Sequence, residues 1–482
     1  MNNLHTALQE FALSEDSRCK ILDGSAIAPV EFVRIAQTAL SGHFLVKGHD
    51  KDIVVRPTCI EFYYHEEQEG GIKDYIVYHK NSGNHRYLPF PMGVLHNHAS
   101  GIDISFESGD APEKAVRASM LIREFDIDGE NEDHSTMLYD ALYQQSSLFD
   151  GISVKWEDGE DVLNVTTYPR KNVALYDSNA CKMSAKDYPD MPATDDRKYV
   201  QDPRCWQFRR SLVNDKDTNK VYISAWLKKE CPEFHVRFTN LLKEKGIPCI
   251  ELKNTADIWA RDYMPVQVYD DLFIQYCYNP DYLQSKSDQV YITDTDAVCK
   301  EFGLQTKKMN LVIDGGNVVK VGKYVIMTEK VYVENASLKP AEIRTQIKRL
   351  FHAEPIMLPW DKQEKYGHAD GIVKSIDDNT VLLTNYGDYD LQMAVRFEKI
   401  LSQYLKVKKL EYSQKTSDSN WAYINFLRVG NTIILPGLGV AEDTQALNQI
   451  QTFYPDCKVL QIECSEVVAK GGALNCITWN IK

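Results

Sequence analysis

Five polar residues in the C-terminal part of the chain have side chains that could together act on a guanidinium group. A guanidinium is planar and carries N–H donors along each edge, so carboxylates that accept paired hydrogen bonds recognise it well. A thiolate held near its central carbon could attack that carbon, and a histidine could protonate the departing nitrogen. We assign these tasks to Cys476 as nucleophile, His368 as general acid and base, Asp262 and Asp370 as the two sides of a clamp, and Asp314 as the partner of the histidine.

The reaction would pass through a covalent intermediate on the cysteine. A bound guanidinium cation and a nearby histidine both favour ionisation of Cys476. After attack, His368 would donate a proton to the departing nitrogen, and the neutral ring would then activate the water that cleaves the thiouronium. Asp314 would fix the tautomer of the imidazole and keep it cationic for the first step. Neighbouring glycines, Gly472 among them, allow tight turns and close approach of the backbone to a substrate.

Each residue of this set also has an ordinary structural explanation. A lone cysteine after a Gly-Gly pair is usually a small buried apolar side chain. An aspartate before Gly-Gly usually forms a turn, and a histidine in the sequence GHAD is more often structural than catalytic. The functional interpretation therefore depends on all five residues occurring together.

The elements that must position these residues repeat along the chain. Successive polar turns centre on residues 262, 314, 368, 425 and 476, with spacings of 52, 54, 57 and 51 residues. Helical segments such as PAEIRTQIKRLF alternate with short apolar strands such as PIMLP. This alternation predicts an α/β domain, and the period predicts a closed, propeller-like ring that gathers the five turns around one axis.

Five ordered motifs carry a family resemblance: WARDYMP, LVIDGGNVV, YGHADG, NWAYINFLRVGNTIILP and GGALNCIT. Over roughly residues 220–482 they resemble the agmatine deiminase and bacterial (Porphyromonas-type) peptidylarginine deiminase family of the guanidino-group modifying superfamily. The resemblance implies a five-bladed α/β propeller of the pentein type and the same five residue roles. Trp259 matches a tryptophan that lines the substrate pocket of agmatine deiminases, and we place Gly472 beside it in the substrate-binding set.

The resemblance implies a hydrolase with no metal and no organic cofactor, and it implies agmatine as the substrate, with N-carbamoylputrescine and ammonia as products. Agmatine deiminases usually carry Glu where this chain has Asp314, so the substrate tail stays open. The alternatives are a peptidyl- or protein-arginine deiminase, an amidinotransferase, and a non-catalytic guanidine-binding protein. Binding alone does not need Cys476, which favours an enzyme.

Charge divides the chain in two. Residues 1–200 hold 33 Asp and Glu against 19 Lys and Arg, so the whole formal net charge of -14 lies there, and the remainder is balanced. We expect an acidic N-terminal domain over residues 1–205 and a catalytic domain over residues 215–482. An acidic domain without a basic face argues against a nucleic-acid partner.

The N-terminal domain has runs of β-branched and aromatic residues separated by polar breaks, which predict an α+β, mainly antiparallel region. TCIEFYYHEE weakly resembles the segment of alkyladenine DNA glycosylases that bears their catalytic glutamate, here Glu61. Seven histidines lie between His43 and His98 without the spacing of a metal site. We expect a scaffold or binding domain rather than a second enzyme.

Eleven cysteines occur without CxxC spacing, and no signal peptide or membrane-spanning segment is evident. These features predict a cytoplasmic protein that acts on a small-molecule or peptidyl guanidine and has no membrane partner. A homo-oligomer is compatible with the sequence.

Overall fold

The computed structural model describes residues 3–48, 51–74, 77, 88–144, 146, 147, 149, 151, 154–160, 163–170, 174–176, 199–413 and 418–482. It divides into two compact units, Met1–Ser211 and Leu212–Lys482. Among the described residues, none of the helices combines the length and the apolar character that crossing a membrane requires.

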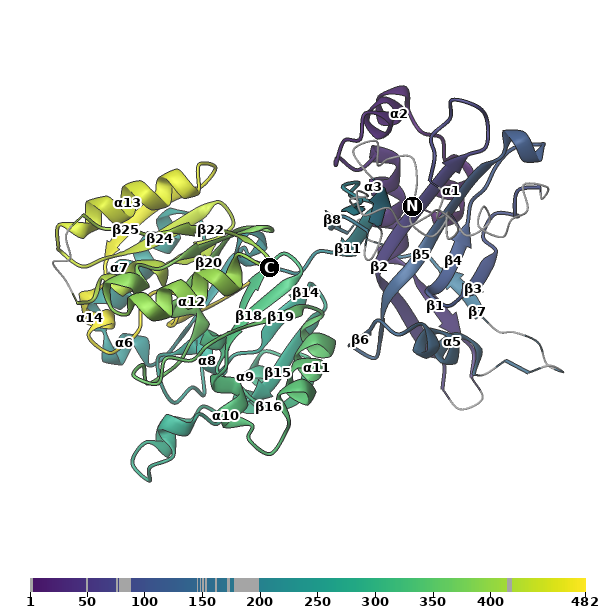
Figure 1. Cartoon of the computed structure of the whole chain (residues 1–482). Helices are drawn as coiled ribbons and strands as arrows, with labels where there is room; N and C mark the ends of the chain where they lie inside the picture. The colour runs from purple at the N-terminus through teal and green to yellow at the C-terminus, as the bar shows by residue number, and fades with distance from the viewer. Residues whose placement is uncertain are drawn as a thin grey trace. The chain divides into compact units, whose positions relative to one another are not determined.

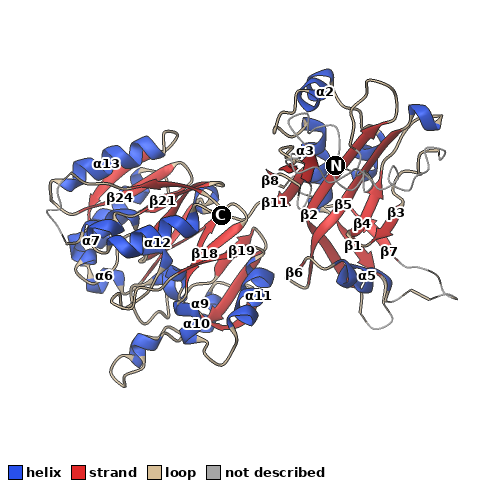
Figure 2. Cartoon of the chain, viewed as in Figure 1, coloured by secondary structure: helices blue, strands red, loops and turns tan. Residues whose placement is uncertain are grey.

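The first unit is built on one antiparallel sheet, which confirms the predicted α+β class (Figures 1 and 2). Two long strands, β2 (Ile53–Glu66) and β5 (Val116–Ile127), pair at its centre. Around them lie shorter strands: β1 (His43–Val46), β3 (Leu95–His98), β4 (Gly101–Ser105), β6 (Glu130–Glu132), β7 (Val154–Glu157), β8 (Val165–Tyr168) and β11 (Gln207–Arg210). A separate pair joins β9 (Ala174–Tyr176) and β10 (Tyr199–Gln201). The predicted strand at residues 74–80 lies largely outside the described residues.

Helices cover one face of this sheet. Residues 4–41 form α1 (Leu4–Gln9), α2 (Glu15–Leu22) and α3 (Val30–Ser41), and α5 (Ser135–Tyr143) follows later in the chain. Phe32 of α3 stacks on Phe62 of β2 with ring centroids 4.4 Å apart, and both rings are fully buried. The core of the first unit therefore lies between the helices and the sheet.

Glu61 lies on β2 and has no solvent exposure. Its carboxylate accepts hydrogen bonds from Arg123 at 2.6 Å, Gln207 at 2.7 Å and the Tyr63 hydroxyl at 2.9 Å. A buried charge is stable only when it is paired and hydrogen-bonded in this way. In this structure the glutamate connects β2 with β5, which carries Arg123, and with β11, which carries Gln207.

The second unit is a ring of five three-stranded sheets, so the predicted five-bladed α/β propeller is confirmed (Figure 2). In each blade two strands pair in parallel through a helical crossover, and a third pairs antiparallel with them. The blades are β26 (Thr478–Ile481), β12 (Lys220–Ser224) and β13 (Cys249–Leu252); β14 (Val266–Tyr269), β15 (Leu272–Cys277) and β16 (Lys307–Val312); β17 (Val319–Val321), β18 (Tyr324–Thr328) and β19 (Glu354–Leu358); β20 (Val373–Asp377), β21 (Thr380–Leu383) and β22 (Lys406–Lys409); β23 (Leu427–Val429), β24 (Thr432–Gly437) and β25 (Lys458–Glu463).

The crossover helices are amphipathic. They are α7 (Pro232–Glu244), α9 (Thr295–Glu301), α11 (Pro340–Phe351), α12 (Leu391–Leu401) and α13 (Glu442–Phe453). In α11, for example, proline opens the helix, where its missing N–H costs nothing. Ile343, Ile347 and Leu350 follow at helical spacing and bury one face against the blade. Four shorter helices lie in the connections: α6 (Leu227–Glu230), α8 (Ala260–Tyr263), α10 (Lys330–Glu334) and α14 (Ser465–Val468).

The ring closes through its two ends. The last strand, β26, pairs antiparallel with β12, with Ile223 opposite Thr478. The backbone N–H of Arg261, on the connection to the second blade, also donates to the carbonyl of Cys476 at 3.0 Å. This closure brings the last turn of the chain beside the first.

A fragment of residues 212–482 should fold alone, because every strand of the five sheets and the closing pair β12–β26 lie within it. We expect the helix and strand content that residues 212–482 have in the structure, measured by circular dichroism, and a single cooperative unfolding transition in denaturant. A fragment that unfolds without a cooperative transition would show that the ring needs residues 3–211.

Candidate active site

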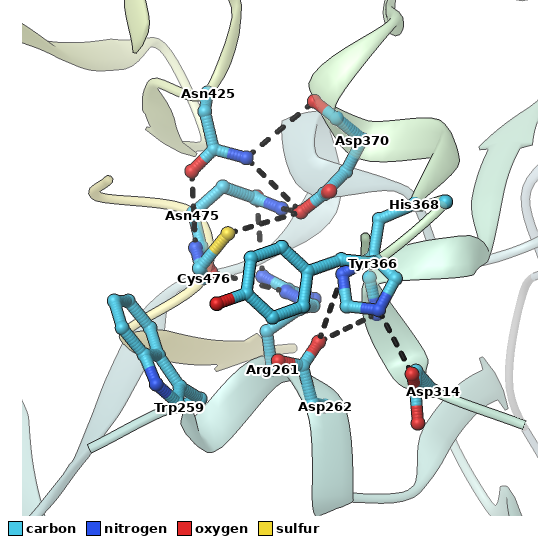
Figure 3. A network of polar contacts seen from close by, with 12 residues as sticks. Trp259, Arg261, Asp262, Asp314, Tyr366, His368, Asp370, Asn425, Asn475 and Cys476 are labelled. Atoms are coloured by element: carbon cyan, nitrogen blue, oxygen red, sulfur yellow. Dashed lines mark hydrogen bonds and ion pairs between the residues drawn. The ribbon is translucent and has the colours of Figure 1, made fainter. Parts of the chain in front are cut away.

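The five predicted turns hold equivalent places in the five blades. Each lies two to five residues before the antiparallel edge strand of its blade: Asp262 before β14, Asp314 before β17, His368 before β20, Asn425 before β23 and Cys476 before β26. The side chains from these turns meet in one network (Figure 3). The sequence spacing therefore reflects one structural position repeated five times.

Cys476 is nearly buried, with 9% of its surface exposed. Its sulfur lies 3.7 Å from Oδ2 of Asp370, and its backbone N–H donates to Oδ1 of Asn425 at 3.2 Å. Burial raises the pKa of this thiol well above its usual value, and the nearby Asp370 and Asp262 charges raise it further. The thiol is therefore protonated in the free site at neutral pH.

His368 lies between two carboxylates. Its Nε2 is 2.9 Å from Oδ2 of Asp314, and its Nδ1 is 3.7 Å from Oδ1 of Asp262. Burial alone would lower the pKa of the imidazole, but the Asp262 charge and the hydrogen bond to Asp314 raise it to about 10. The ring is a cation at neutral pH, and Asp314 holds one nitrogen so that the other faces the site.

The two predicted clamp carboxylates are both buried, and each is held by amide donors. Asp262 accepts the backbone N–H of Gly316 at 3.0 Å. Asp370 accepts the side-chain amides of Asn475 at 2.7 Å and Asn425 at 3.1 Å. The other oxygen of Asp370, Oδ1, is buried and has no hydrogen-bond partner among the described residues. These contacts fix the carboxylates while leaving acceptor capacity for a ligand.

Negative charge accumulates in this site. The pKa of Asp262 is raised to about 8, chiefly by burial. The negative charges of Asp314 and Asp370 also raise this pKa, and the positive charge of His368 lowers it. The pKa values of Asp257 and Glu334 rise to about 7, again first through burial. An arriving cation would relieve this repulsion and favour the ionised carboxylates. The charges of the site therefore favour a cationic ligand over a neutral one.

Trp259 and Gly472 lie together on one wall of the site. A Cβ atom on Gly472 would come within 2.4 Å of the indole, so only glycine allows the ring to take its place. Both residues line a cavity of about 420 Å³ that also exposes Asp262, His368 and Cys476. The structure thus places both predicted substrate-binding residues at the predicted site.

Two further polar residues support the site and were not among the predicted site residues. Asn475, next to Cys476, receives hydrogen bonds from Lys374 at 2.6 Å and from Arg261 at 3.4 Å on its side-chain oxygen, and donates to Asp370. Asn425 was recognised only as the centre of a turn. The one signal in the sequence was that Asn475 is adjacent to Cys476. Asparagine and lysine residues stand beside a site residue by chance too often for this signal to select them.

Among the described residues, no group of three or more His, Cys, Asp or Glu side chains is placed to hold a metal ion. Of the seven N-terminal histidines, several lie outside the described part of the chain. The ten described cysteines are all free thiols.

Comparison with known families gives one match over most of the chain. The family model described as Porphyromonas-type peptidyl-arginine deiminase matches residues 193–481. A Streptococcus mutans protein assigned as an agmatine deiminase is 25% identical over 286 residues, which cover 49% of this chain and 77% of that protein. An Enterococcus faecalis protein with the same assignment is 42% identical over 57 residues, covering 12% of this chain and only 16% of its own length.

Two solved structures are also similar. The C. jejuni agmatine deiminase aligns with 56% of this chain and 95% of its own, at 17% identity and a TM-score of 0.47. The agmatine deiminase of Enterococcus faecalis aligns with 56% of this chain and 95% of its own, at 19% identity and a TM-score of 0.45.

Replacing Gly316 by alanine should disrupt the histidine, because the added Cβ would lie 2.5 Å from Nδ1 of His368 and 2.8 Å from Oδ1 of Asp262. We expect Gly316→Ala to lower the free energy of unfolding by about 1–3 kcal/mol, measured by chemical denaturation. Gly371→Ala is the matched control, since no atom lies within 4 Å of its added Cβ. It should change stability by less than about 0.5 kcal/mol, and equal losses in the two variants would contradict the packing described here.

Proposed function

Because this chain belongs to the Porphyromonas-type peptidyl-arginine deiminase family, we propose that it is a hydrolase that removes ammonia from a guanidine and leaves a ureido product. The observation that carries this proposal is the convergence of Cys476, His368 and three buried carboxylates within one network. A guanidine-binding protein would need the carboxylates alone. The thiol and the cationic imidazole add a nucleophile and a proton donor.

The guanidinium enters between Asp262 and Asp370, which accept its N–H groups from two sides. Charge-assisted hydrogen bonds of this kind are the strong ones, and they are stronger in a buried site than in water. Since Cys476 lies 3.7 Å from Asp370, the clamp holds the central carbon close to the sulfur.

The bound cation favours loss of the thiol proton, which passes to solvent. A positive charge beside the sulfur opposes the two carboxylates that raise the pKa of Cys476 in the free site. The thiolate attacks the guanidinium carbon, forming the Sγ–C bond and a tetrahedral adduct. The site therefore generates its nucleophile only when a cationic substrate is present.

His368 then acts as an acid and afterwards as a base. Its Nδ1 proton passes to the departing nitrogen, the C–N bond breaks, and ammonia leaves a thiouronium on Cys476. The neutral ring takes a proton from water, the water oxygen bonds to the carbon, and the C–S bond breaks. The ureido product forms as the remaining proton of the water oxygen passes to the sulfur. The histidine regained its positive charge with the first proton of the water, and the hydrogen bond to Asp314 stabilises that cation.

Agmatine is the substrate that we propose, with N-carbamoylputrescine and ammonia as products. The assignment of the curated relatives as agmatine deiminases supports this choice, as does the acidic lining of the site. Arginine in a peptide is the second candidate, since the matching family is described by that substrate.

One assay separates these substrates. Ureido product is measured colorimetrically with agmatine, free arginine, arginyl peptides and simple alkylguanidines, and ammonia is measured in parallel. Agmatine should give the highest kcat/KM. Equimolar ureido product and ammonia are expected, and the absence of ureido product from every guanidine would defeat the proposed function.

Cys476→Ala should lower kcat more than about a thousandfold, because it removes the nucleophile of a unit in which each member is essential. Cys476→Ser should be nearly as inactive, since a hydroxyl at its normal pKa is a poor nucleophile. Both variants should unfold at the wild-type denaturant concentration. Turnover by a folded Cys476→Ala variant near the wild-type rate would exclude the covalent mechanism.

Asp314→Asn should move the alkaline limb of the kcat/KM profile to lower pH. The carboxylate stabilises the cationic imidazole and contributes to the rise of the His368 pKa to about 10. Removing it lowers that pKa, so the proton donor is lost at a lower pH, by about one to three units. Asp314→Glu restores a carboxylate and should keep the wild-type limb. Superimposable wild-type and Asp314→Asn profiles would contradict this role.

A further inference from the structure

The reactive sulfur lies where two cavities meet. The first chamber is the cavity of about 420 Å³ described above, lined by Trp259, Asp262 and Tyr282 among others. The second chamber holds about 530 Å³ and is lined by Trp360, Asp361, Glu364, Asp370, Tyr386, Asp390, Asn425 and Trp421, among others. Among the described residues, five line both chambers: Tyr366, His368, Gly471, Gly472 and Cys476. Nucleophile and acid are thus accessible from two directions.

Tyr366 lines both chambers. Its ring stands beside Cys476 and His368 (Figure 3). The hydroxyl reaches the glycine pair, because a Cβ on Gly471 would lie 3.4 Å from it. Its backbone is held by Lys330, which donates to the Tyr366 carbonyl at 2.9 Å. The two clamp carboxylates line different chambers, Asp262 the first and Asp370 the second, so a guanidinium held between them lies where the chambers meet.

The chambers differ in charge. The first contains basic as well as acidic side chains, Lys365 and Lys470 together with Asp257 and Glu230. Among the described residues that line the second, none is Lys or Arg, and four are carboxylates: Asp361, Glu364, Asp370 and Asp390. The second chamber also has aromatic walls, where the Tyr386 hydroxyl donates to Asp361 at 2.7 Å. Carboxylates and aromatic faces together favour an alkylammonium.

Ammonia alone does not account for the size of the second chamber. A water molecule, which ammonia resembles in size, occupies about 30 Å³ in the liquid. The chamber is more than ten times larger, and it opens directly at the sulfur and the histidine. It has room for an organic group attached to the nitrogen that leaves.

We propose that the second chamber receives the departing nitrogen and admits an alkyl group on it, so that the enzyme also releases primary amines from N,N′-disubstituted guanidines. This inference rests on the proposed deiminase function. The substrate tail then occupies the first chamber, whose mixed charges suit tails of either sign. The amine-bearing substituent occupies the second chamber.

The chemistry balances as in the release of ammonia. The Sγ–C bond of Cys476 forms, and the C–N bond to the substituted nitrogen breaks with its electron pair on that nitrogen. His368 supplies one proton, so a neutral primary amine departs and becomes an ammonium by taking a proton from water. Positive charge develops on the leaving nitrogen in this step, and preorganised carboxylates stabilise such charge. Water then cleaves the thiouronium to the same ureido product.

The test uses the full-length protein and three substrates that share one ureido product, N-carbamoylputrescine. These are agmatine, agmatine with an ethyl group on a terminal guanidine nitrogen, and agmatine with a 2-aminoethyl group there. Released ammonia, ethylamine and ethylenediamine are quantified by mass spectrometry after derivatisation. If another guanidine proves to be the substrate, its corresponding derivatives replace these.

We expect both amines to be released, with the aminoethyl derivative favoured over the ethyl derivative by about fivefold in kcat/KM, as expected for a partly exposed charge pair. Asp361→Asn should remove this preference while keeping an acceptor for Tyr386. Glu230→Gln, a charge change in the first chamber, should retain it. Asp390→Asn serves as a second test variant, since an asparagine can also cap the helix that begins after Asp390.

Three outcomes would overturn the inference. Turnover of agmatine without turnover of either derivative would show that the second chamber admits no substituent. If Asp361→Asn and Asp390→Asn both keep the preference for the aminoethyl over the ethyl derivative, the carboxylates of the second chamber do not face the amine. An equal loss of kcat/KM on all three substrates in Asp361→Asn would show that the substrate tail, and not the leaving amine, occupies the second chamber. Failure of every guanidine, including agmatine, would instead defeat the proposed function.

Discussion

The antiparallel pairing of the last strand with the first strand of the ring is the contact on which the site depends. Cys476 lies two residues before β26, and Asp262 lies on the connection that follows β13 of the same blade. Without the pairing of Ile223 with Thr478, more than 200 residues of chain would separate the sulfur from Asp262. The Arg261 N–H bond to the Cys476 carbonyl then fixes the two turns against each other. The strand pairing that closes the ring therefore also positions Cys476 beside Asp262.

Buried charge is the second constraint. Three of the five turns bring Asp262, Asp314 and Asp370 within one site, and a single cationic histidine cannot balance them. The protein offsets the remainder with oriented amides from Asn425, Asn475 and the backbone of Gly316. Amides supply hydrogen bonds without adding positive charge, so the site keeps its attraction for a cation.

The ring and the residues within it followed from the sequence because they repeat. Equal spacing of polar turns predicted that Asp262, Asp314, His368 and Cys476 would meet, and the structure brings them together. The supporting residues were not predictable in the same way. Asn475, Lys374 and Tyr366 act through their position in space, and no periodicity marks them. In the first unit, runs of β-branched and aromatic residues predicted the strands, whereas the hydrogen bonds of Glu61 join β2 to residues up to 146 positions away in the sequence.

The same excess of carboxylates bears on how a reaction cycle ends. A guanidinium arrives as a cation, whereas a ureido group is neutral, so the electrostatic attraction that holds the substrate is absent for the product. The pKa values near 7 and 8 of Asp257, Glu334 and Asp262 allow these acids to take up protons once the cation is gone. The emptied clamp would then bind the ureido compound weakly, and product inhibition would be slight even at high conversion.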